Sequence, residues 1–218
     1  MRAEDLSGET IVITAGATRE ELDPVRFISN YSSGKMGFAL ASAASRRGAK
    51  VALVAGTSAV EPPAGVRVVR INSAEEMHGA VMSEIAAATV FIGAAAVADY
   101  RPVRREADKI KKSGKNLILE LEPTPDILHD VSRHRHERLT VVGFAAETVS
   151  VIEHARAKLK RKNLDLIVAN DVSQPGTVFG ADTNRVTILR AGGGGDALEL
   201  SVMPKREVAD RILDEIIS

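Results

Sequence analysis

A long polar segment, residues 16–33, separates the first predicted strand from the first predicted helix. It contains side chains that bind anions and amides: Arg19, Arg26, Asn30, Ser32 and Ser33. The step Gly34-Lys35-Met36-Gly37 follows, and backbone N–H groups at the start of a helix form a natural seat for phosphate. Long connections between a strand and a helix usually have a function. The segment therefore indicates binding of a phosphorylated ligand, and the alternative is that its polar side chains only satisfy the loop backbone.

This segment matches neither of the two common phosphate-binding motifs. A P-loop needs a glycine at its first position and a serine or threonine after its lysine, but Ser29 and Met36 stand there. A dinucleotide fingerprint needs Gly-x-Gly-x-x-Gly directly after the strand, which Gly16-Ala17-Thr18 does not supply. We therefore predict an anion site of another kind, whose phosphate-loop candidates are Gly16, Ser32, Ser33, Gly34 and Lys35.

Two groups of lysines add local positive charge farther along the chain. One is Lys109-Ile110-Lys111-Lys112; the other contains Lys158 and Lys162, one helical turn apart, so that both can point at the same phosphate tail. The whole chain has 29 basic and 29 acidic residues and only 3% aromatic residues, which argues against nucleic-acid binding. The lysines suit a small anionic ligand, and the alternative is that they form solvated faces.

The composition excludes several other classes of protein. There is no cysteine, which rules out disulfides, thiolate catalysis and Cys-based zinc sites. The closely spaced His134 and His136 lie in an Arg-rich run and form no convincing metal site. No stretch approaches the roughly 18 apolar residues of a membrane-spanning helix, and the acidic N-terminus does not resemble a signal peptide. We therefore expect a cytoplasmic protein that does not bind membranes.

The elements that must position these residues alternate between strands and helices, which predicts an α/β fold with a Rossmann-like, mostly parallel sheet flanked by helices. Strands are predicted at 10–15, 50–55, 66–71, 89–94, 139–144 and 166–169, and helices at 37–47, 73–87, 150–162 and 208–217, with a short one starting at 124–126. The alternating segments 185–189 and 198–203, joined through Gly192 to Gly195, predict an antiparallel hairpin near the C-terminus. No linker divides the chain, so residues 1–218 are predicted to form a single α/β domain.

Motifs along nearly the whole chain closely resemble, in the same order, those of phosphopantothenate–cysteine ligases. They are Ile13 to Glu20, Asp23 to Asn30, Ser32 to Gly37, Ala94 to Tyr100, Lys109 to Lys112, Pro125 to Leu128, Gly143 to Thr148, Lys162 to Asp165, Ala169 to Val172 and Phe179-x-x-Asp182-x-Asn184. The Lys-Ile-Lys-Lys segment is similar to that of the bacterial, CTP-using type. In most bacteria this ligase is the C-terminal half of a bifunctional protein, and the other half is a flavin-dependent decarboxylase.

The resemblance implies a two-step reaction of coenzyme A biosynthesis. The carboxylate of 4′-phosphopantothenate attacks the α-phosphate of CTP, which releases pyrophosphate and leaves an acyl-cytidylate. The amine of cysteine then attacks the activated carbonyl, and CMP departs. The resemblance also implies Mg²⁺ on the triphosphate, a homodimer in which a segment near Lys109 closes over the partner's site, and a fused decarboxylase as a further partner. Residues 101–115 are the matching lid-like segment.

The resemblance also assigns roles to single residues. Lys109 would offset charge at the α-phosphate in the first step, and Asn30 would act on the intermediate in the second. The substrate-binding candidates are Arg26, Asn30 and Ala96, and the nucleotide-binding candidates are Gly93, Ala94, Ala95, Asp99, Lys109, Pro125, Asp126, Ile127, Leu128, Phe144, Lys158 and Lys162. Asp99 is the candidate contact for the ribose or for a phosphate-bound metal ion. The ring of Phe144 would flank the base, and the alternative is that it belongs to the core, as is commoner for phenylalanine.

Two functions of other classes share these features. An NADP-dependent oxidoreductase would have the same fold class, but the failed fingerprint and the long first loop argue against it. A non-catalytic nucleotide-binding regulator would have a similar pocket. Pyrophosphate release that depends on phosphopantothenate would separate a ligase from such a regulator.

Overall fold

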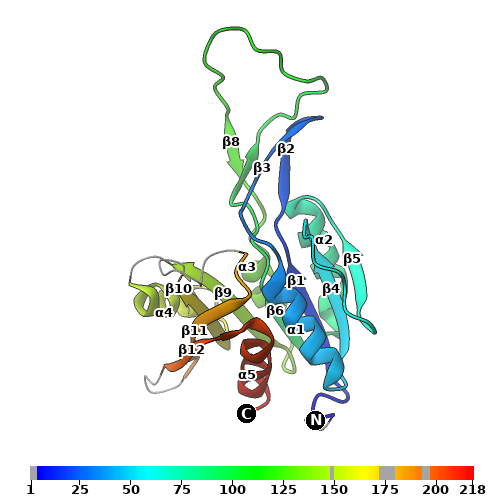
Figure 1. The fold of residues 1–218 in the computed structure, drawn as a ribbon, viewed down its shortest axis with the longest axis vertical. Coiled ribbons are helices and arrows are strands. Elements are labelled where there is room, and N and C mark those ends of the chain that lie inside the picture. Colours follow the sequence, from blue (N-terminus) through cyan, green and yellow to red (C-terminus); the bar gives the residue numbers. More distant parts are fainter. Residues whose placement is uncertain (1–3, 148–149, 172–179, 193–196) are drawn as a thin grey trace.

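The computed structural model describes residues 4–147, 150–171, 180–192 and 197–218, and its centre is an eight-stranded sheet (Figure 1). The strand order is β12-β11-β10-β9-β6-β1-β4-β5. The parallel strands are β1 (Thr10–Ala15), β4 (Lys50–Ala55), β5 (Arg67–Arg70), β6 (Val90–Gly93), β9 (Thr140–Glu147) and β10 (Leu166–Asp171). β11 (Thr183–Arg190) and β12 (Leu198–Pro204) join the sheet as an antiparallel pair. The predicted α/β fold, with its hairpin near the C-terminus, is confirmed.

Helices cover both faces of the sheet because its central strands are apolar on both sides. α1 (Lys35–Arg46) and α5 (Lys205–Ile217) pack on one face, and α2 (Ala74–Glu84), the 3₁₀ helix η1 (Ile85–Ala87), α3 (Ile127–Arg133) and α4 (Val151–Arg161) pack on the other. Side chains of β1 alternate accordingly: Ile11 and Ile13 belong to the first layer and Val12 to the second.

The N-terminal part of α1 packs directly against β1, which places the predicted phosphate loop beside the sheet. A Cβ atom on Gly37 would lie 2.5 Å from the Cβ of Ala15, closer than two such atoms can approach. Gly37 therefore sets the distance between this helix and the strand that precedes the loop.

The sequence also predicts a capping box of Ser73 with Glu76 and an apolar stripe on the last helix that includes Ile212 and Ile217, and the structure differs from both in detail. Ser73 caps α2 by accepting the N–H of Glu76 at 3.2 Å, but the Glu76 carboxylate accepts the N–H of Asn72 at 2.7 Å instead of that of Ser73. The predicted capping box is therefore one residue out of register. On α5, Ile212 is buried as expected, whereas Ile217, the last residue of the helix, is 45% exposed.

Residues 16–33 are not the structureless loop that the sequence analysis expected. β2 (Arg19–Asp23) and β3 (Arg26–Ser29) form an antiparallel hairpin. Asp23 Oδ1 accepts the N–H groups of Val25 and Arg26, each at 2.9 Å, and so closes the turn around Pro24. Asp followed by Pro is a turn signal. The expectation was wrong because the length of the segment was weighed above this local signal.

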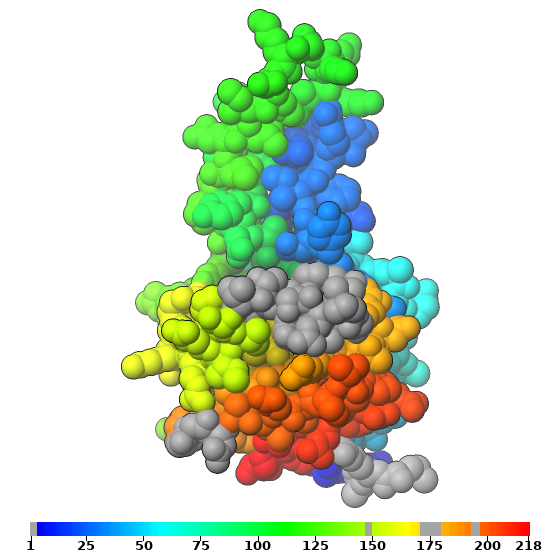
Figure 2. All heavy atoms as spheres, turned by 60° about the vertical axis from the view of Figure 1, so that its left-hand side comes forward, coloured from blue at the N-terminus to red at the C-terminus, as the bar shows by residue number. Residues whose placement is uncertain are grey.

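A second antiparallel pair, β7 (Tyr100–Pro102) and β8 (Leu121–Pro123), stands beside the first, with β7 in contact with β2. Residues 18–31 and 99–124 together form what we call the arm. It projects beyond the carboxyl ends of β1 and β6 and stands clear of the body of the molecule (Figures 1 and 2). The predicted lid-like segment, residues 101–115, lies in this arm. Among the described residues, none of the helices has the length and apolar content needed to cross a membrane.

Candidate active site

A cavity of about 560 Å³ lies over β6 and β9, between α3 and α4. Ten of the predicted nucleotide-binding residues line it: Gly93, Ala95, Asp99, Pro125, Asp126, Ile127, Leu128, Phe144, Lys158 and Lys162. Thr14 and Arg161 also line it, although the sequence analysis did not single them out. Arg161 lies between the two predicted lysines, and its place in the same basic run was the signal that could have found it.

Small residues occur in and beside the lining of this cavity: Gly93 and Ala95 line it, and Gly143 is next to Gly93 in the register of β6 and β9. A Cβ atom added to Gly93 would lie 3.2 Å from Leu128, and one added to Gly143 would lie 2.6 Å from Leu164. Both glycines therefore allow close packing of the adjacent segments. At Gly93 the same lack of a side chain leaves the backbone open to a ligand.

Lys158 of α4 and Lys162, the C-cap of that helix, line this cavity. Lys158 Nζ donates to the carbonyl of Phe144 at 2.8 Å. The Lys162 ammonium, on a side chain that is 17% exposed, forms an ion pair with Asp126. Because both cations lie on one face of the helix, they can contact the same run of phosphates. A phosphate at Lys162 would compete with the carboxylate of Asp126.

Asp126 begins α3 and links it to α4. Its Oδ1 accepts the N–H of His129 at 3.1 Å, the usual bond of a helix N-cap. Burial raises the pKa of the Asp126 carboxyl, but the Lys162 ammonium and the His129 N–H together hold that pKa below its ordinary value. Asp126 is therefore charged at neutral pH and keeps Lys162 in place before a ligand arrives.

Asp99 lies at the mouth of the cavity, and its side chain is exposed. Thr124 holds the surrounding backbone: its N–H donates to the carbonyl of Asp99 at 3.0 Å and its hydroxyl donates to that of Ala98 at 2.6 Å. Across the described part of the chain, no group of three or more His, Cys, Asp or Glu residues is placed to hold a metal ion. A single carboxylate fits Mg²⁺ that is bound chiefly by phosphates and water.

Two predicted nucleotide-binding residues are oriented toward the other face of the sheet. Ala94 and the ring of Phe144 pack against the cluster beneath α1 and α5, opposite to α3 and α4. Successive side chains of a strand point to opposite faces, which explains both positions. The predicted stacking of the Phe144 ring on a base does not match this orientation. Its carbonyl, which accepts Lys158, is the group that the structure places at the cavity.

Lys109 does not line this cavity. It lies in the arm, beside a separate hollow of about 660 Å³ formed by Leu22 and the segment between β7 and β8. The next residue, Ile110, is bound to the first hairpin: its N–H donates to Asp23 Oδ2 at 3.0 Å, and its carbonyl accepts Arg26 Nη2 at 2.5 Å. The structure thus brings Arg26, a predicted substrate-binding residue, next to the segment that carries Lys109.

Asp23 is a functional candidate that the sequence analysis missed, although it stands in the Asp-Pro-Val-Arg motif. Its side chain has no exposed surface and forms an ion pair with Arg26 at 2.6 Å. Burial raises the pKa of Asp23, but the N–H groups of Val25 and Ile110 and the Arg26 guanidinium hold that pKa below its ordinary value. The carboxylate is therefore charged at neutral pH.

Asn30 and Ala96, two further predicted substrate-binding residues, lie together where β1 and β6 end. Asn30 Nδ2 donates to the carbonyl of Ala96 at 3.2 Å. The same carbonyl accepts the N–H of Thr18 at 3.2 Å, and the N–H of Ala96 donates to the carbonyl of Gly16 at 2.9 Å. This backbone network holds the Asn30 amide at the base of the arm.

The phosphate-loop candidates surround the start of α1. Gly34 has a φ of 79°, and Ser32 Oγ and Ser33 Oγ accept the N–H groups of Gly34 and Lys35 at 3.3 and 3.5 Å. Lys35 Nζ contacts Asp182 at 2.6 Å, and the side chain lines a different hollow of about 390 Å³. Phosphate binding by these residues stays a prediction. The motif residues Thr148, Val172 and Phe179 and the hairpin tip at 193–195 lie outside the described residues.

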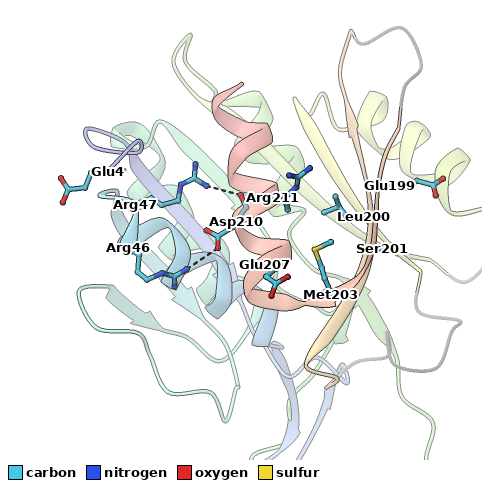
Figure 3. Close-up of a pocket in the computed structure, with 10 residues that line it drawn as sticks. All are labelled: Glu4, Arg46, Arg47, Glu199, Leu200, Ser201, Met203, Glu207, Asp210 and Arg211. Atoms are coloured by element: carbon cyan, nitrogen blue, oxygen red, sulfur yellow. Dashed lines mark hydrogen bonds and ion pairs between the residues drawn. The ribbon is translucent and has the colours of Figure 1, made fainter. Parts of the chain in front are cut away.

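A larger hollow, about 800 Å³, lies between α1, α5 and β12 (Figure 3). None of the predicted site residues lines it. Two of its arginines contact acidic residues of the same chain: Arg46 contacts Asp210 at 3.7 Å, and Arg47 contacts Asp5 at 2.6 Å and Asp214 at 3.0 Å. The smaller cavity over β6 and β9 is therefore the better candidate for the chemistry.

The structure is a mostly parallel α/β sheet with a cavity beyond the carboxyl ends of its strands, which is where sheets of this class bind their ligands. The family model "DNA/pantothenate metabolism flavoprotein C-terminal domain" matches residues 6–218, and the chain belongs to this family. It is 47% identical to the Coenzyme A biosynthesis bifunctional protein CoaBC of Haemophilus influenzae, over 98% of this chain and 52% of that protein. Identity to the protein of the same name from Escherichia coli is 48%, over 98% and 53% of the two chains.

A solved structure gives the same result for the fold. The crystal structure of the C-terminal domain of Coenzyme A biosynthesis bifunctional protein CoaBC matches with a TM-score of 0.84 and 42% identity. That match covers 99% of this chain and 97% of the other. The chain spans about half the length of the bifunctional relatives, as the 52% and 53% coverage shows.

Proposed function

We propose that this chain is the phosphopantothenate–cysteine ligase domain of coenzyme A biosynthesis. CTP activates the carboxylate of 4′-phosphopantothenate as an acyl-cytidylate with release of pyrophosphate, and cysteine then displaces CMP to give 4′-phosphopantothenoylcysteine. One observation carries the proposal: ten of the twelve residues that the ligase resemblance assigns to the nucleotide line one cavity. The identity of 47% to a coenzyme A biosynthesis protein supports it.

Each group at the cavity has a role in this proposal. Lys158 and Lys162 bind the triphosphate, and Lys162 exchanges its bond to Asp126 for one to a phosphate. Backbone groups at the start of α3 contact the cytosine edge or a phosphate. Bound Mg²⁺ would neutralise phosphate charge, and the Asp99 carboxylate is the candidate protein ligand for it. Asn30, held against Ala96, contacts the acyl group of the intermediate.

The decisive experiment is an assay of pyrophosphate release with CTP, phosphopantothenate and Mg²⁺, with and without cysteine. We expect release only when phosphopantothenate is present. Lys109→Gln is expected to lower the first step by about 10²-fold or more, because it removes a cation from the developing charge. The matched control is Lys115→Gln, an exposed lysine of the same loop, which should retain activity. Asn30→Asp is expected to accumulate acyl-cytidylate.

Other results would favour other functions. Nucleotide binding without any pyrophosphate release, with either CTP or ATP, would contradict the ligase and favour a regulator. Binding of NADPH, detected as a change in its fluorescence on titration with the protein, would favour an oxidoreductase. Comparison of CTP with ATP at equal concentration tests the proposed preference for cytosine.

We also propose that the active form is a homodimer formed through the arm. Of the twelve large hydrophobic residues that are exposed in the described part of the chain, nine lie in the arm: Val25, Phe27, Tyr31, Tyr100, Val103, Leu117, Ile118, Leu119 and Leu121. Apolar residues gathered on one exposed region favour an interface. Lys109 lies in this arm and not at the cavity of its own chain, which supports its action in the site of a second copy.

Mixing two inactive variants tests this arrangement. If Lys109 acts across the dimer, a Lys109→Gln chain paired with a Lys158→Met chain has one intact site, made from the cavity of the first and the arm of the second. Random mixing should then restore about a quarter of wild-type activity, since half of the dimers are mixed and half of their sites are intact. No recovery, with heterodimers shown to form, would contradict action across the dimer.

Two further predictions extend to the whole protein. The relatives are bifunctional and about twice as long as this chain, which supports a fused decarboxylase in a full-length protein. Mass determination of the protein from its native source would test the fusion. The cytoplasmic location stays a prediction from the sequence, and cell fractionation would test it.

A further inference from the structure

The carboxylate of Asp23 contacts two segments that are far apart in the sequence. Oδ1 accepts the N–H groups of Val25 and Arg26 and closes the turn of the first hairpin. Oδ2 accepts the N–H of Ile110, which is 87 residues away, and contacts the guanidinium of Arg26. The turn of the hairpin uses only Oδ1, so the bonds of Oδ2 are not needed to close it and instead connect the hairpin to Ile110.

The bonds of the second oxygen determine where the Lys109 backbone lies. The N–H of Ile110 belongs to the same planar peptide unit as the Cα and carbonyl of Lys109. Asp23 holds this unit through the N–H, and Arg26, itself paired with Asp23, holds the following carbonyl at 2.5 Å. The backbone on the C-terminal side of Lys109 is therefore fixed while its exposed side chain stays able to reach a ligand.

Other contacts between the hairpin and this loop lie farther from Lys109 along the chain. The N–H of Glu106 donates to the carbonyl of Leu22 at 2.9 Å, and Arg105 pairs with Glu21 at 2.6 Å. The Arg105 and Glu21 side chains are 59% and 38% exposed, so water weakens their attraction. The Asp23 side chain has no exposed surface, which makes its bonds the stronger connection.

We propose that Asp23 is a positioning residue for the first reaction step: through Ile110 it holds Lys109 at the place from which its ammonium reaches the α-phosphate. This inference rests on the ligase function proposed above. Asp23 touches neither substrate in this arrangement and acts through Ile110 and Arg26. Positioning of this kind has a large effect because a displacement of about 1 Å in a reacting group costs about 10²-fold in rate.

The substitution Asp23→Asn separates the two purposes of this side chain. The remaining amide oxygen can still accept the turn N–H groups of Val25 and Arg26. The amide NH₂ replaces Oδ2 and faces two donors, the Ile110 N–H and the Arg26 guanidinium. The turn is therefore retained, and the connection to Ile110 is lost. Glu21→Gln is the matched control, since it removes a charged contact between the same two segments.

The experiment measures activity and amide hydrogen exchange on the full chain. For Asp23→Asn we expect kcat of pyrophosphate release to fall about 10- to 100-fold with KM for CTP changed less than about threefold. The Ile110 amide should exchange at least about tenfold faster while those of Val25 and Arg26 keep their rates. Glu21→Gln should stay within about twofold of the wild type in kcat.

Two outcomes in the active enzyme overturn the proposal, and a third does so whether or not the enzyme is active. One is a kcat for Asp23→Asn that falls no further than for Glu21→Gln. The other is faster exchange of all three amides with a fall in the melting temperature, which shows that Asp23 only folds the hairpin. Failure of the ligase function itself is recognised separately, since the wild type would then release no pyrophosphate. Unchanged Ile110 exchange in Asp23→Asn overturns the proposal whether or not the wild type is active.

Discussion

The sheet and the arm are held together by different interactions. In the sheet, side chains such as Leu53 and Phe91 are fully buried between two layers of helices. The arm has exposed ionic contacts: Arg101 of β7 bonds to Glu122 of β8 at 2.9 Å, and also to Glu75 of α2 at 3.0 Å. Apolar burial contributes about 25 cal/mol for each Å² removed from water, whereas exposed ion pairs contribute little. The sheet therefore provides most of the stability of the fold.

This difference separates the proposed active site into two parts, one on the sheet and one on the arm. The cavity with Lys158 and Lys162 is built on the sheet and its helices, while Arg26 and Lys109 are carried by the arm. A rigid scaffold suits recognition of the nucleotide. An arm held by polar contacts can adjust its position at small cost in overall stability. Substitutions in the two regions should therefore change different measured quantities.

The largest effect is expected in the sheet. Leu53→Ala removes a fully buried side chain and leaves a cavity, so the free energy of unfolding should fall by about 2–5 kcal/mol. Leu117→Ala removes the same atoms from the arm, where the side chain is 56% exposed. We expect it to weaken the proposed dimer while the free energy of unfolding stays within about 0.5 kcal/mol. Urea denaturation measures the free energy of unfolding, and sedimentation equilibrium measures dimer formation. Equal losses of unfolding free energy in Leu53→Ala and Leu117→Ala would remove the distinction between the sheet and the arm.

An intermediate effect is expected where the sheet meets the phosphate-loop candidates. Gly37→Ala places a Cβ atom 2.5 Å from Ala15 and must push α1 away from β1. Overpacking of this kind lowers the free energy of unfolding by about 1–3 kcal/mol. Gly79→Ala, on the outer side of α2 with no atom within 4 Å, is the matched control and should not destabilise. A Gly37→Ala protein as stable as the wild type would show that α1 can shift freely.

A small effect is expected for the ionic contacts of the arm. Arg101→Gln removes the contacts with Glu122 and Glu75, whose side chains are 42% and 62% exposed. The free energy of unfolding should fall by less than about 1 kcal/mol, which corresponds to at most about 4 °C in Tm for a chain of this size. Differential scanning calorimetry at low and high salt measures this change in Tm. A larger loss that persists at high salt would show that the arm contributes to stability as the sheet does.

The smallest effect is expected from pH in the neutral range. The pKa values of Asp23 in the arm and Asp126 at the cavity both lie below the ordinary value. A depressed carboxyl pKa contributes stability that is complete above the ordinary value and is lost as pH falls through the lower one. Both contacts should therefore stay unchanged between about pH 5 and 8 and weaken only below about pH 4. The carboxyl ¹³C chemical shifts of Asp23 and Asp126 follow the titration of each group. A titration midpoint above about pH 5 for either carboxyl would contradict its charge pairing.

The sequence predicted the alternating elements of the sheet and ten residues of its cavity, but it did not predict the first hairpin. Strands such as β1 and β4 have apolar runs that neighbouring residues alone make recognisable. The turn around Pro24 was equally local, and the Asp-Pro pair could have revealed it. The hairpin was not predicted because the length of residues 16–33 was taken to indicate a loop, although the Asp-Pro pair indicated a turn.

The sequence by itself determined the class of fold, the order of its main strands and helices and ten of the residues that line the cavity, because periodicity and motifs act over short distances along the chain. Only the tertiary structure decided that Asp23 meets Ile110, that Lys109 lies away from the cavity and that the Phe144 ring faces the other side of the sheet. Contacts across 87 residues depend on how the arm packs. No local pattern specifies that packing.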